Sequence, residues 1–239
     1  MSQRGPRPTT PENPNVKNSV IAIDGPSASG KTVVGKRLAK CLGFRFVDTG
    51  AMYRAITCLA LEFKLNLEDA GRLTELAQGT TLELATDSGV DGATVIRADG
   101  QDLTDKIRSP EVDRAVSQVS KVPGVRAAMV KAQRELARQG GVVMVGRDIG
   151  TVVLPDAGVK VFLTASSEER AMRRYKELWE HKVSVQYNDV LSDLQRRDKI
   201  DSSRPVSPLR PAPDAHLVNT DDLSIDQVVE AICHIVKRV

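Results

Sequence analysis

The chain has 239 residues, 41% of them hydrophobic, which suits one enzyme-sized domain with a substantial core. A net charge of +3 is modest and only 3% of the residues are aromatic, so we expect no nucleic-acid partner that depends on base stacking. Because no apolar run approaches the roughly 20 residues of a membrane span, we expect no membrane partner either.

The first 18 residues differ in composition from the rest of the chain. They hold four prolines among polar neighbours, a composition that buries too little apolar surface to offset the entropy of ordering. We therefore predict a disordered tail over residues 1–18 and one globular domain over residues 19–239.

Residues 20–43 combine a strand, a glycine-containing loop and a helix. The apolar run from Val20 to Ile23 suits a buried parallel strand that ends at Asp24. Apolar residues at positions 34, 38, 41 and 42 recur at helical spacing, and Gly43 is typical of the residue just beyond a helix end. The loop between strand and helix, residues 25–32, reads Gly-Pro-Ser-Ala-Ser-Gly-Lys-Thr.

This loop has the pattern that holds the phosphates of a nucleoside triphosphate. Gly25 and Gly30 allow a tight curl with inward-pointing backbone N–H groups. Lys31 would place a positive charge between the outer phosphates, and Thr32 would offer its hydroxyl to Mg²⁺. The predicted ATP-binding residues are Gly25, Pro26, Ser27, Ala28, Ser29, Gly30, Lys31, Thr32 and Val33. The alternative is a simple strand-to-helix turn with an exposed lysine, which the flanking strand and helix disfavour.

The remaining elements follow in chain order. Apolar runs predict strands at residues 44–47, 142–145, 159–163 and 215–218, and helical spacing predicts helices at about 52–63, 110–121, 125–138, from 166 onward and 224–237. Residues 80–105 contain two short alternating runs, 82–85 and 93–98, separated by turn residues, and predict a small hairpin insert. Strands that alternate with helices predict an α/β fold with a doubly wound parallel sheet of five strands.

The segment Gly146-Arg147-Asp148-Ile149-Gly150-Thr151 follows the third strand of that sheet. In open α/β sheets this edge forms the ligand crevice, so we expect Arg147 and Asp148 to face a ligand beside the phosphate-binding loop. The two residues alone leave an alternative open, in which they pair with each other or cap the next turn.

Several segments together carry a resemblance to a known family. They are Asp48-Thr49-Gly50-Ala51-Met52-Tyr53-Arg54, Ser117-Gln118-Val119, Val125-Arg126, the run from Gly146 to Val153, and Arg197-Asp198 with Asp201 and Arg204. In this order they resemble the bacterial cytidylate kinases, from about Val20 to the C-terminus. The resemblance implies a P-loop NTPase fold of the adenylate-kinase type, with a short lid and an insert at about residues 80–105 that binds the nucleoside monophosphate.

The resemblance also implies roles for individual residues. Thr49, Tyr53, Arg54 and Arg147 would surround the phosphate of the monophosphate, Ser117, Arg126 and Asp148 would read its base, and Arg197, Asp201 and Arg204 would hold its sugar and phosphate side. Cytosine has an amine that donates beside two acceptors, so a carboxylate with an arginine and a hydroxyl complements it, whereas uracil would present a carbonyl to Asp148. Taken singly, each of the last three residues could be an exposed helix-end ion pair.

Three arginines lie on the helix that begins near Ser166. Arg170, Arg173 and Arg174 are three and four residues apart and share a helix face, which by itself is a solvated basic face. In kinases of the resembled type an arginine-bearing lid closes over the triphosphate, because phosphoryl transfer needs charge stabilisation and exclusion of water. We therefore predict a lid at about residues 179–188, and a catalytic role for these three arginines together with Lys31 and Arg147.

The predicted reaction is transfer of the γ-phosphoryl group of ATP to CMP or dCMP, with Mg²⁺ required. One alternative is another nucleoside monophosphate kinase, for UMP or dTMP. Another is a GTP- or ATP-binding switch protein, although the chain has neither an Asn-Lys-x-Asp nor an Asp-x-x-Gly motif. Cys41, Cys58 and Cys233 form no Cys-x-x-Cys pair, which favours neither a disulfide framework nor a zinc site. We expect a monomer in the cytoplasm.

Overall fold

The computed structural model describes residues 20–86, 94–180 and 182–238. Its main sheet has the strand order β2-β6-β1-β7-β8 and every neighbouring pair is parallel, which confirms the predicted fold class. The strands are β1 (Val20–Asp24), β2 (Arg45–Asp48), β6 (Val142–Gly146), β7 (Val159–Thr164) and β8 (His216–Asn219). The tail predicted over residues 1–18 and the turn predicted between the two hairpin runs, residues 87–93, lie outside the described residues.

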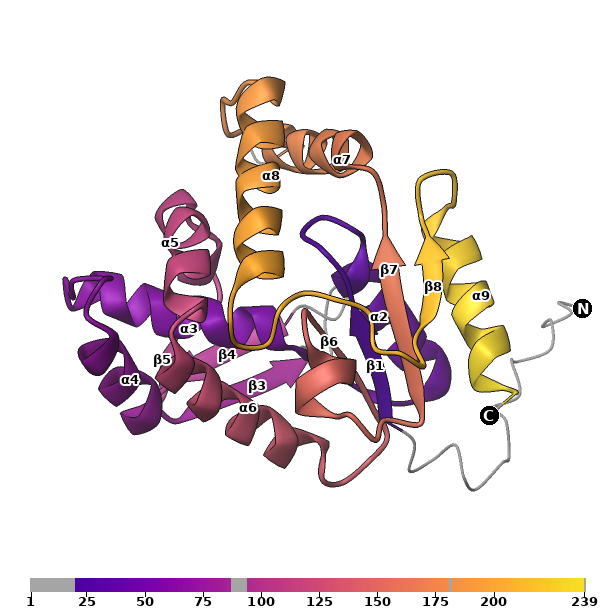
Figure 1. The fold of residues 1–239 in the computed structure, drawn as a ribbon, viewed down its shortest axis with the longest axis horizontal. Helices are drawn as coiled ribbons and strands as arrows, with labels where there is room; N and C mark the ends of the chain where they lie inside the picture. Colours follow the sequence, from indigo (N-terminus) through magenta and orange to yellow (C-terminus); the bar gives the residue numbers. More distant parts are fainter. Residues whose placement is uncertain (1–19, 87–93, 181, 239) are drawn as a thin grey trace, which may run out of the picture.

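Helices cover both faces of the main sheet (Figure 1). On one face α2 (Lys31–Leu42) and α9 (Ile225–Val236) pack against the strands, and Leu38 and Ile232 share a buried cluster with Ile21. On the other face Ala22 and Met144 pack with α6 (Pro123–Ala137) and with the short turn η3 (Ile149–Val153). The alternation of Ile21 and Ala22 between faces is the period of two that a strand imposes.

Local sequence sets the ends of these helices. Helix α2 begins after Gly30 and ends at Gly43, and both glycines adopt left-handed backbone with φ of 90° and 67°. Helix α9 starts with a capping box between Ser224 and Gln227. Helix α3 (Thr49–Glu62) starts three residues before the predicted boundary, because the Asp48 side chain accepts a hydrogen bond from the Gly50 N–H and caps it there.

A second group of elements packs beside the main sheet. It contains α3, α4 (Ala70–Gly79), α5 (Pro110–Ser120), α6, the turn η2 (Lys106–Arg108) and an antiparallel sheet of β3 (Leu82–Thr86), β4 (Thr94–Ala98) and β5 (Gln101–Asp102). Ile56, Leu73 and Met129 lie in one of its buried clusters. The small sheet confirms the predicted β-containing insert, whereas α4, β5, η2 and η3 were not predicted. The binding role of this insert stays a prediction.

Helices α7 (Ser167–Glu180) and α8 (Tyr187–Ser203) project beyond the carboxyl ends of the main strands (Figure 1). They pack on each other through a small core of Ala171, Val190 and Leu194. The segment predicted as a lid, 179–188, thus includes the last residues of α7 and the first of α8, and its role as a lid stays a prediction. Among the described helices, none combines the length and the apolar character that crossing a membrane requires.

Candidate active site

Three strand ends bring the predicted site residues to one edge of the main sheet. Strands β2, β6 and β1 are neighbours, and they end at Asp48, Gly146 and Asp24. The phosphate-binding loop follows β1, α3 with Tyr53 follows β2, and Arg147 follows β6. These segments are far apart in sequence and meet because parallel strands end at a common edge.

The loop between β1 and α2, which is predicted to hold phosphates, contains an obligatory glycine and precedes a buried lysine. A Cβ at Gly25 would collide with the carbonyl oxygen of Leu163, so only glycine fits there. Lys31 is buried, and its Nζ donates to the carbonyl of Pro26 at 2.5 Å, so the alternative of an exposed loop lysine is wrong. Burial, and then the positive charge of Arg147, hold the pKa of Lys31 well below its ordinary value. An anion placed at the N-terminus of α2 would relieve this charge repulsion.

An oxygen pair lies beside the loop. The hydroxyl of Thr32 donates to Oδ2 of Asp48 at 3.1 Å, and Oδ1 of Asp48 caps α3. Asp48 was not among the predicted site residues, although its place at the end of β2 is a sequence signal that could have identified it. In the described part of the chain, no group of three or more His, Cys, Asp or Glu side chains is arranged to hold a metal ion.

Asp24 connects the end of β1 to the segment that follows β6. Its two carboxylate oxygens each accept a hydrogen bond at 2.7 Å, one from the N–H of Ile149 and one from the N–H of Gly150. It thereby fixes the segment that carries Arg147 and Asp148 to the end of β1. Burial raises the pKa of Asp24 to about 6, although the two backbone donors oppose the shift.

The raised pKa of Asp24 predicts a pH-dependent contribution to stability. Because the folded state holds this proton more tightly than the unfolded state, the contribution is present below about pH 4 and is lost as pH rises through about 6. The free energy of unfolding of the wild type, minus that of Asp24→Asn, should therefore decrease by up to roughly 3 kcal/mol between these pH values. Urea unfolding of both proteins at several pH values measures this difference. A difference that is independent of pH would show that folding does not shift the pKa of Asp24.

Arginines and acids alternate where the acceptor phosphate is predicted to bind. Arg147 donates from Nε to Oδ2 of Asp201 at 2.9 Å, and Arg54 lies 2.5 Å from the carboxylate of Asp113. Burial raises the pKa of Asp201, but Arg147 and Arg204 outweigh it and lower that pKa overall. The Thr49 hydroxyl donates to the carbonyl of Val145 at 2.8 Å and so ties α3 to β6.

The residues predicted to read the base form a second, more deeply buried group. Arg126 is only 2% exposed, donates to Asp148, and lies over the ring of Tyr53 at 5.3 Å. Arg204 approaches Asp148 to 3.9 Å, and Ser117 is buried on α5. The alternative in which Arg147 and Asp148 pair with each other is wrong, because the two neighbours have different partners.

The three arginines of α7 do not converge. Arg170 donates to the Ser27 carbonyl of the phosphate-binding loop at 3.2 Å and to Asp198 at 2.7 Å. Arg173 donates to the backbone and hydroxyl of Thr220, and Arg174 bonds Asp113 on α5. The alternative of a solvated basic face is therefore wrong for Arg170, which is buried, and the catalytic role of the three arginines stays a prediction.

Buried polar atoms that lack hydrogen-bond partners gather at this site. Among the described residues they include Tyr53 Oη, Asp113 Oδ1, Arg126 Nε, Arg197 Nε, Asp198 Oδ1 and Arg204 Nη2. More than nine in ten buried polar groups in native proteins are hydrogen-bonded. Such a concentration at the carboxyl edge of a sheet marks a place that a polar ligand completes.

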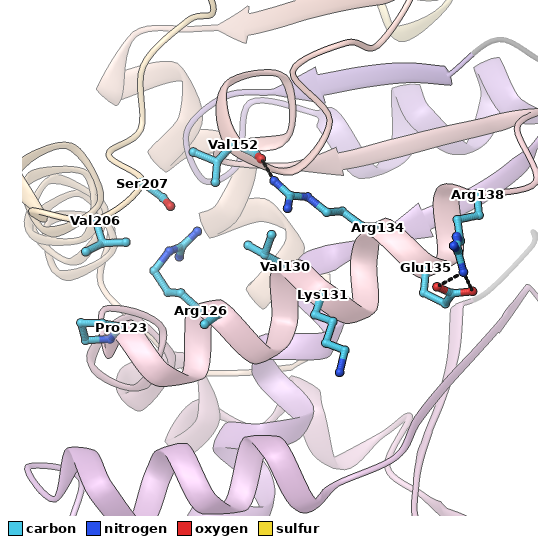
Figure 2. A pocket seen from close by; sticks show the side chains of 11 residues that line it. Pro123, Arg126, Val130, Lys131, Arg134, Glu135, Arg138, Val152, Val206 and Ser207 are labelled. Atoms are coloured by element: carbon cyan, nitrogen blue, oxygen red, sulfur yellow. Dashed lines mark hydrogen bonds and ion pairs between the residues drawn. The ribbon is translucent and has the colours of Figure 1, made fainter.

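A separate hollow of about 600 Å³ lies along α6 (Figure 2). Apolar and basic side chains line it, among them Val130, Lys131 and Val206. Arg134 is held there by the carbonyls of Val152 and Val153. Of the predicted site residues only Arg126 reaches this hollow, so the phosphate-binding loop lies elsewhere.

Several known proteins are similar to this chain over most of its length. The model of the cytidylate kinase family matches residues 21–238. The chain is 49% identical over 222 residues to the cytidylate kinase of Bacillus velezensis, a match that covers 93% of this chain and 98% of that protein. It is 50% identical over 222 residues to the bifunctional pantoate ligase/cytidylate kinase of a Synechococcus strain, and this match covers 93% of the chain but only 41% of that longer relative. A solved structure of an uncharacterized protein from Eubacterium ventriosum shares the fold, with a TM-score of 0.50 and 13% identity over 92% of this chain and 98% of that one.

Proposed function

Because the chain belongs to the cytidylate kinase family and is an ATP-dependent phosphotransferase, we propose that it transfers the γ-phosphoryl group of ATP to CMP or dCMP at the sheet edge described above. The products are ADP and CDP or dCDP. The observation that carries this assignment is the cluster of buried polar groups without partners, three of them arginines, at the sheet edge that also bears the loop of residues 25–33. A nucleotide offers phosphate, sugar and base groups to such a cluster, and the planar fork of arginine suits phosphate oxygens.

The donor nucleotide occupies the loop of residues 25–33. Its β- and γ-phosphates lie against the backbone N–H groups at the start of α2, and Lys31 exchanges its contact with the Pro26 carbonyl for a phosphate oxygen. Arg170 supports the loop through Ser27. Arg173 and Arg174 contribute to charge stabilisation only after α7 has moved, because both are bonded elsewhere in this form.

Thr32 and Asp48 are suited to Mg²⁺. They supply a hydroxyl and a carboxylate oxygen 3.1 Å apart, and Mg²⁺ prefers a small number of protein oxygens together with water and phosphate. When bound there, the ion neutralises charge on the phosphates of ATP.

The acceptor nucleotide lies between α3, α5, α6 and the segment after β6. Arg54, Arg147 and Arg197 bind its phosphate, while Asp201 and Arg204 hold the sugar side, and Tyr53 and Thr49 line the same end of α3. Ser117, Arg126 and Asp148 contact the base, with the carboxylate accepting from the cytosine amine. No protein nucleophile is involved. The acceptor oxygen attacks in line, and catalysis consists of positioning and charge stabilisation.

Arg147→Ala should raise the KM for CMP at least about tenfold and leave the KM for ATP within about twofold, because Arg147 is proposed to contact the acceptor phosphate. Steady-state kinetics with each substrate varied in turn measures both constants. Arg138→Ala is the matched control, since Arg138 is 74% exposed at the end of α6 and forms its ion pair with the neighbouring Glu135. Equal effects on both substrates would assign Arg147 to the donor side or to the fold.

A coupled assay of ADP formation across CMP, dCMP, UMP, dTMP, AMP and GMP tests the assignment as a whole. We expect the highest kcat/KM for CMP or dCMP, and a preference for UMP or dTMP would overturn the assignment.

We further propose that the protein acts as a monomer in the cytoplasm, without a nucleic-acid or membrane partner. The modest net charge supports the absence of a nucleic-acid or membrane partner, and the lack of paired cysteine motifs supports a reducing compartment. Light scattering during gel filtration would reveal a dimer.

A further inference from the structure

One carboxylate outside the predicted site gathers three of its arginines. Asp113 lies on α5, and the guanidinium groups around it come from Arg54 on α3, Arg174 on α7 and Arg197 on α8. Arg54 approaches Oδ1 to 2.5 Å and Arg197 to 3.8 Å, while Arg174 bonds Oδ2. The side chain of Asp113 is 15% exposed. These helices surround the carboxyl edge of the sheet (Figure 1).

The helix that carries Asp113 is packed through other residues. Val112, Val116 and Val119 are buried in the clusters shared with α3 and α6. The side chain of Ser109 caps its first turn. Apolar packing and this cap hold α5, while the carboxylate of Asp113 contacts arginines of three other helices.

The arginines around Asp113 keep much of their hydrogen-bonding capacity. Within the described residues, Nε of the buried Arg197 has no hydrogen-bond partner, and Oδ1 of Asp113 accepts no bond of proper geometry. Arg54 donates to the carbonyl of Ile107 at 3.2 Å, besides its 2.5 Å approach to Asp113. The contact of Asp113 with Arg197, at 3.8 Å, is mainly electrostatic, and Nε of Arg197 remains able to donate to a phosphate.

We propose that Asp113 is a positioning residue of the acceptor site, which holds Arg54 and Arg197 side by side so that both reach the phosphate of the nucleoside monophosphate. The proposal rests on the proposed function. Two neighbouring guanidinium groups repel each other, and a single carboxylate between them offsets this repulsion. Burial, followed by the charge of Arg54, lowers the pKa of Arg197 to about 10, whereas the charge of Asp113 acts in the opposite direction.

The third contact connects the acceptor site to α7. Arg174 reaches Asp113 from the helix that precedes the predicted lid, and it also pairs with Glu177 at 2.8 Å. Burial tends to raise the pKa of Asp113, but Arg54, Arg174 and Arg197 outweigh it and keep the carboxylate ionised. The charge that orders the arginines is therefore present throughout the neutral pH range.

The test compares four proteins: wild type, Asp113→Asn, Asp113→Glu and Glu111→Gln. Glu111 is the matched control, because it is an exposed acid on the same helix and its ion pair is with Arg114 on that helix, at 3.6 Å. For each protein we would measure kcat and KM for CMP and ATP, and the Kd for CMP by calorimetry without ATP. The asparagine variant should raise the Kd and KM for CMP at least about tenfold, since misplacement by about 1 Å can cost about 10²-fold. The KM for ATP should stay within about twofold.

Asp113→Glu keeps the charge but moves it by one methylene, so it should show a smaller loss that is again confined to CMP. Losses that fall equally on CMP and ATP would overturn the proposal, as would a glutamate variant with wild-type affinity for CMP or an asparagine variant that matches Glu111→Gln. If Asp113→Asn does not fold, Asp113→Glu alone decides between these outcomes. A wild type that fails to phosphorylate CMP would instead overturn the proposed function, which keeps the two failures apart.

Discussion

Lys31→Ala is expected to lower kcat by at least about 10²- to 10³-fold while the protein stays folded. Lys31 is the first residue of α2 and the one basic residue among residues 25–33. Phosphoryl transfer depends on charge stabilisation there. Its Nζ reaches a loop carbonyl, and burial disfavours its charged form, so its head group stabilises the fold little in the absence of an anion. Catalysis should therefore fall far more than stability.

Measurement of kcat with saturating ATP and CMP, together with thermal unfolding, separates the two effects. Lys40→Ala is the control, because Lys40 is exposed at the other end of the same helix. A variant that keeps more than about a tenth of the wild-type rate would show that this loop does not hold the transferred phosphate. A large drop in unfolding temperature would show that Lys31 has a structural role.

Most of the main sheet could be predicted from sequence because its strands carry continuous apolar runs. The strands from Val142 and Val159 are buried between helices on both faces, and such strands need no alternation. The order of the strands then brought the loop after β1 beside the segment after β6. Helices with clear end signals, such as α9 with Ser224 and Gln227, were placed to within a residue or two.

Elements without a strong local signal escaped prediction. Helix α4 buries only Leu73 and Ala77 and contains two glycines, so its apolar stripe is too short to recognise, although Asp69 caps its first turn. The turn η3 contains Thr151 and a Val-Val pair, which favour strands. Its conformation depends on Asp24, whose carboxylate binds the N–H groups of Ile149 and Gly150 across the sheet. A tertiary contact of this kind has no signature in local sequence.

In the candidate site, the positions of several residues could be predicted from sequence, but the partners of their side chains could not. Residues at strand ends, such as Arg147 and Asp148, were identified because position in an α/β sheet predicts proximity to a ligand. The pairing of their side chains was not predictable, since Arg147 finds Asp201 on α8 and Asp148 finds Arg126 on α6. Asp113 had no signal at all. It is one acid on an amphipathic helix, and only the fold brings three arginines to it.

Asp148→Asn is expected to lower the ratio of kcat/KM for CMP to that for UMP by at least about tenfold. Arg126 and Arg204 are both buried against Asp148, so the oxygen of the new amide will accept from Arg126 and its nitrogen will face the base. An amide nitrogen donates, so it loses the cytosine amine as a partner and gains the carbonyl of uracil. The substitution should hurt CMP and spare UMP.

The matched control is Asp156→Asn, an exposed aspartate on the same connection between β6 and β7. Measuring kcat/KM for both nucleotides in wild type and in both variants distinguishes base reading from support of the site. If activity falls equally with CMP and UMP, Asp148 acts only by neutralising Arg126 and Arg204, and base selection must come from Ser117 and Arg126. The ratio decides the question because a change in folding or in phosphate binding affects both nucleotides equally, whereas the amine and carbonyl differ only at the position that Asp148 is proposed to face.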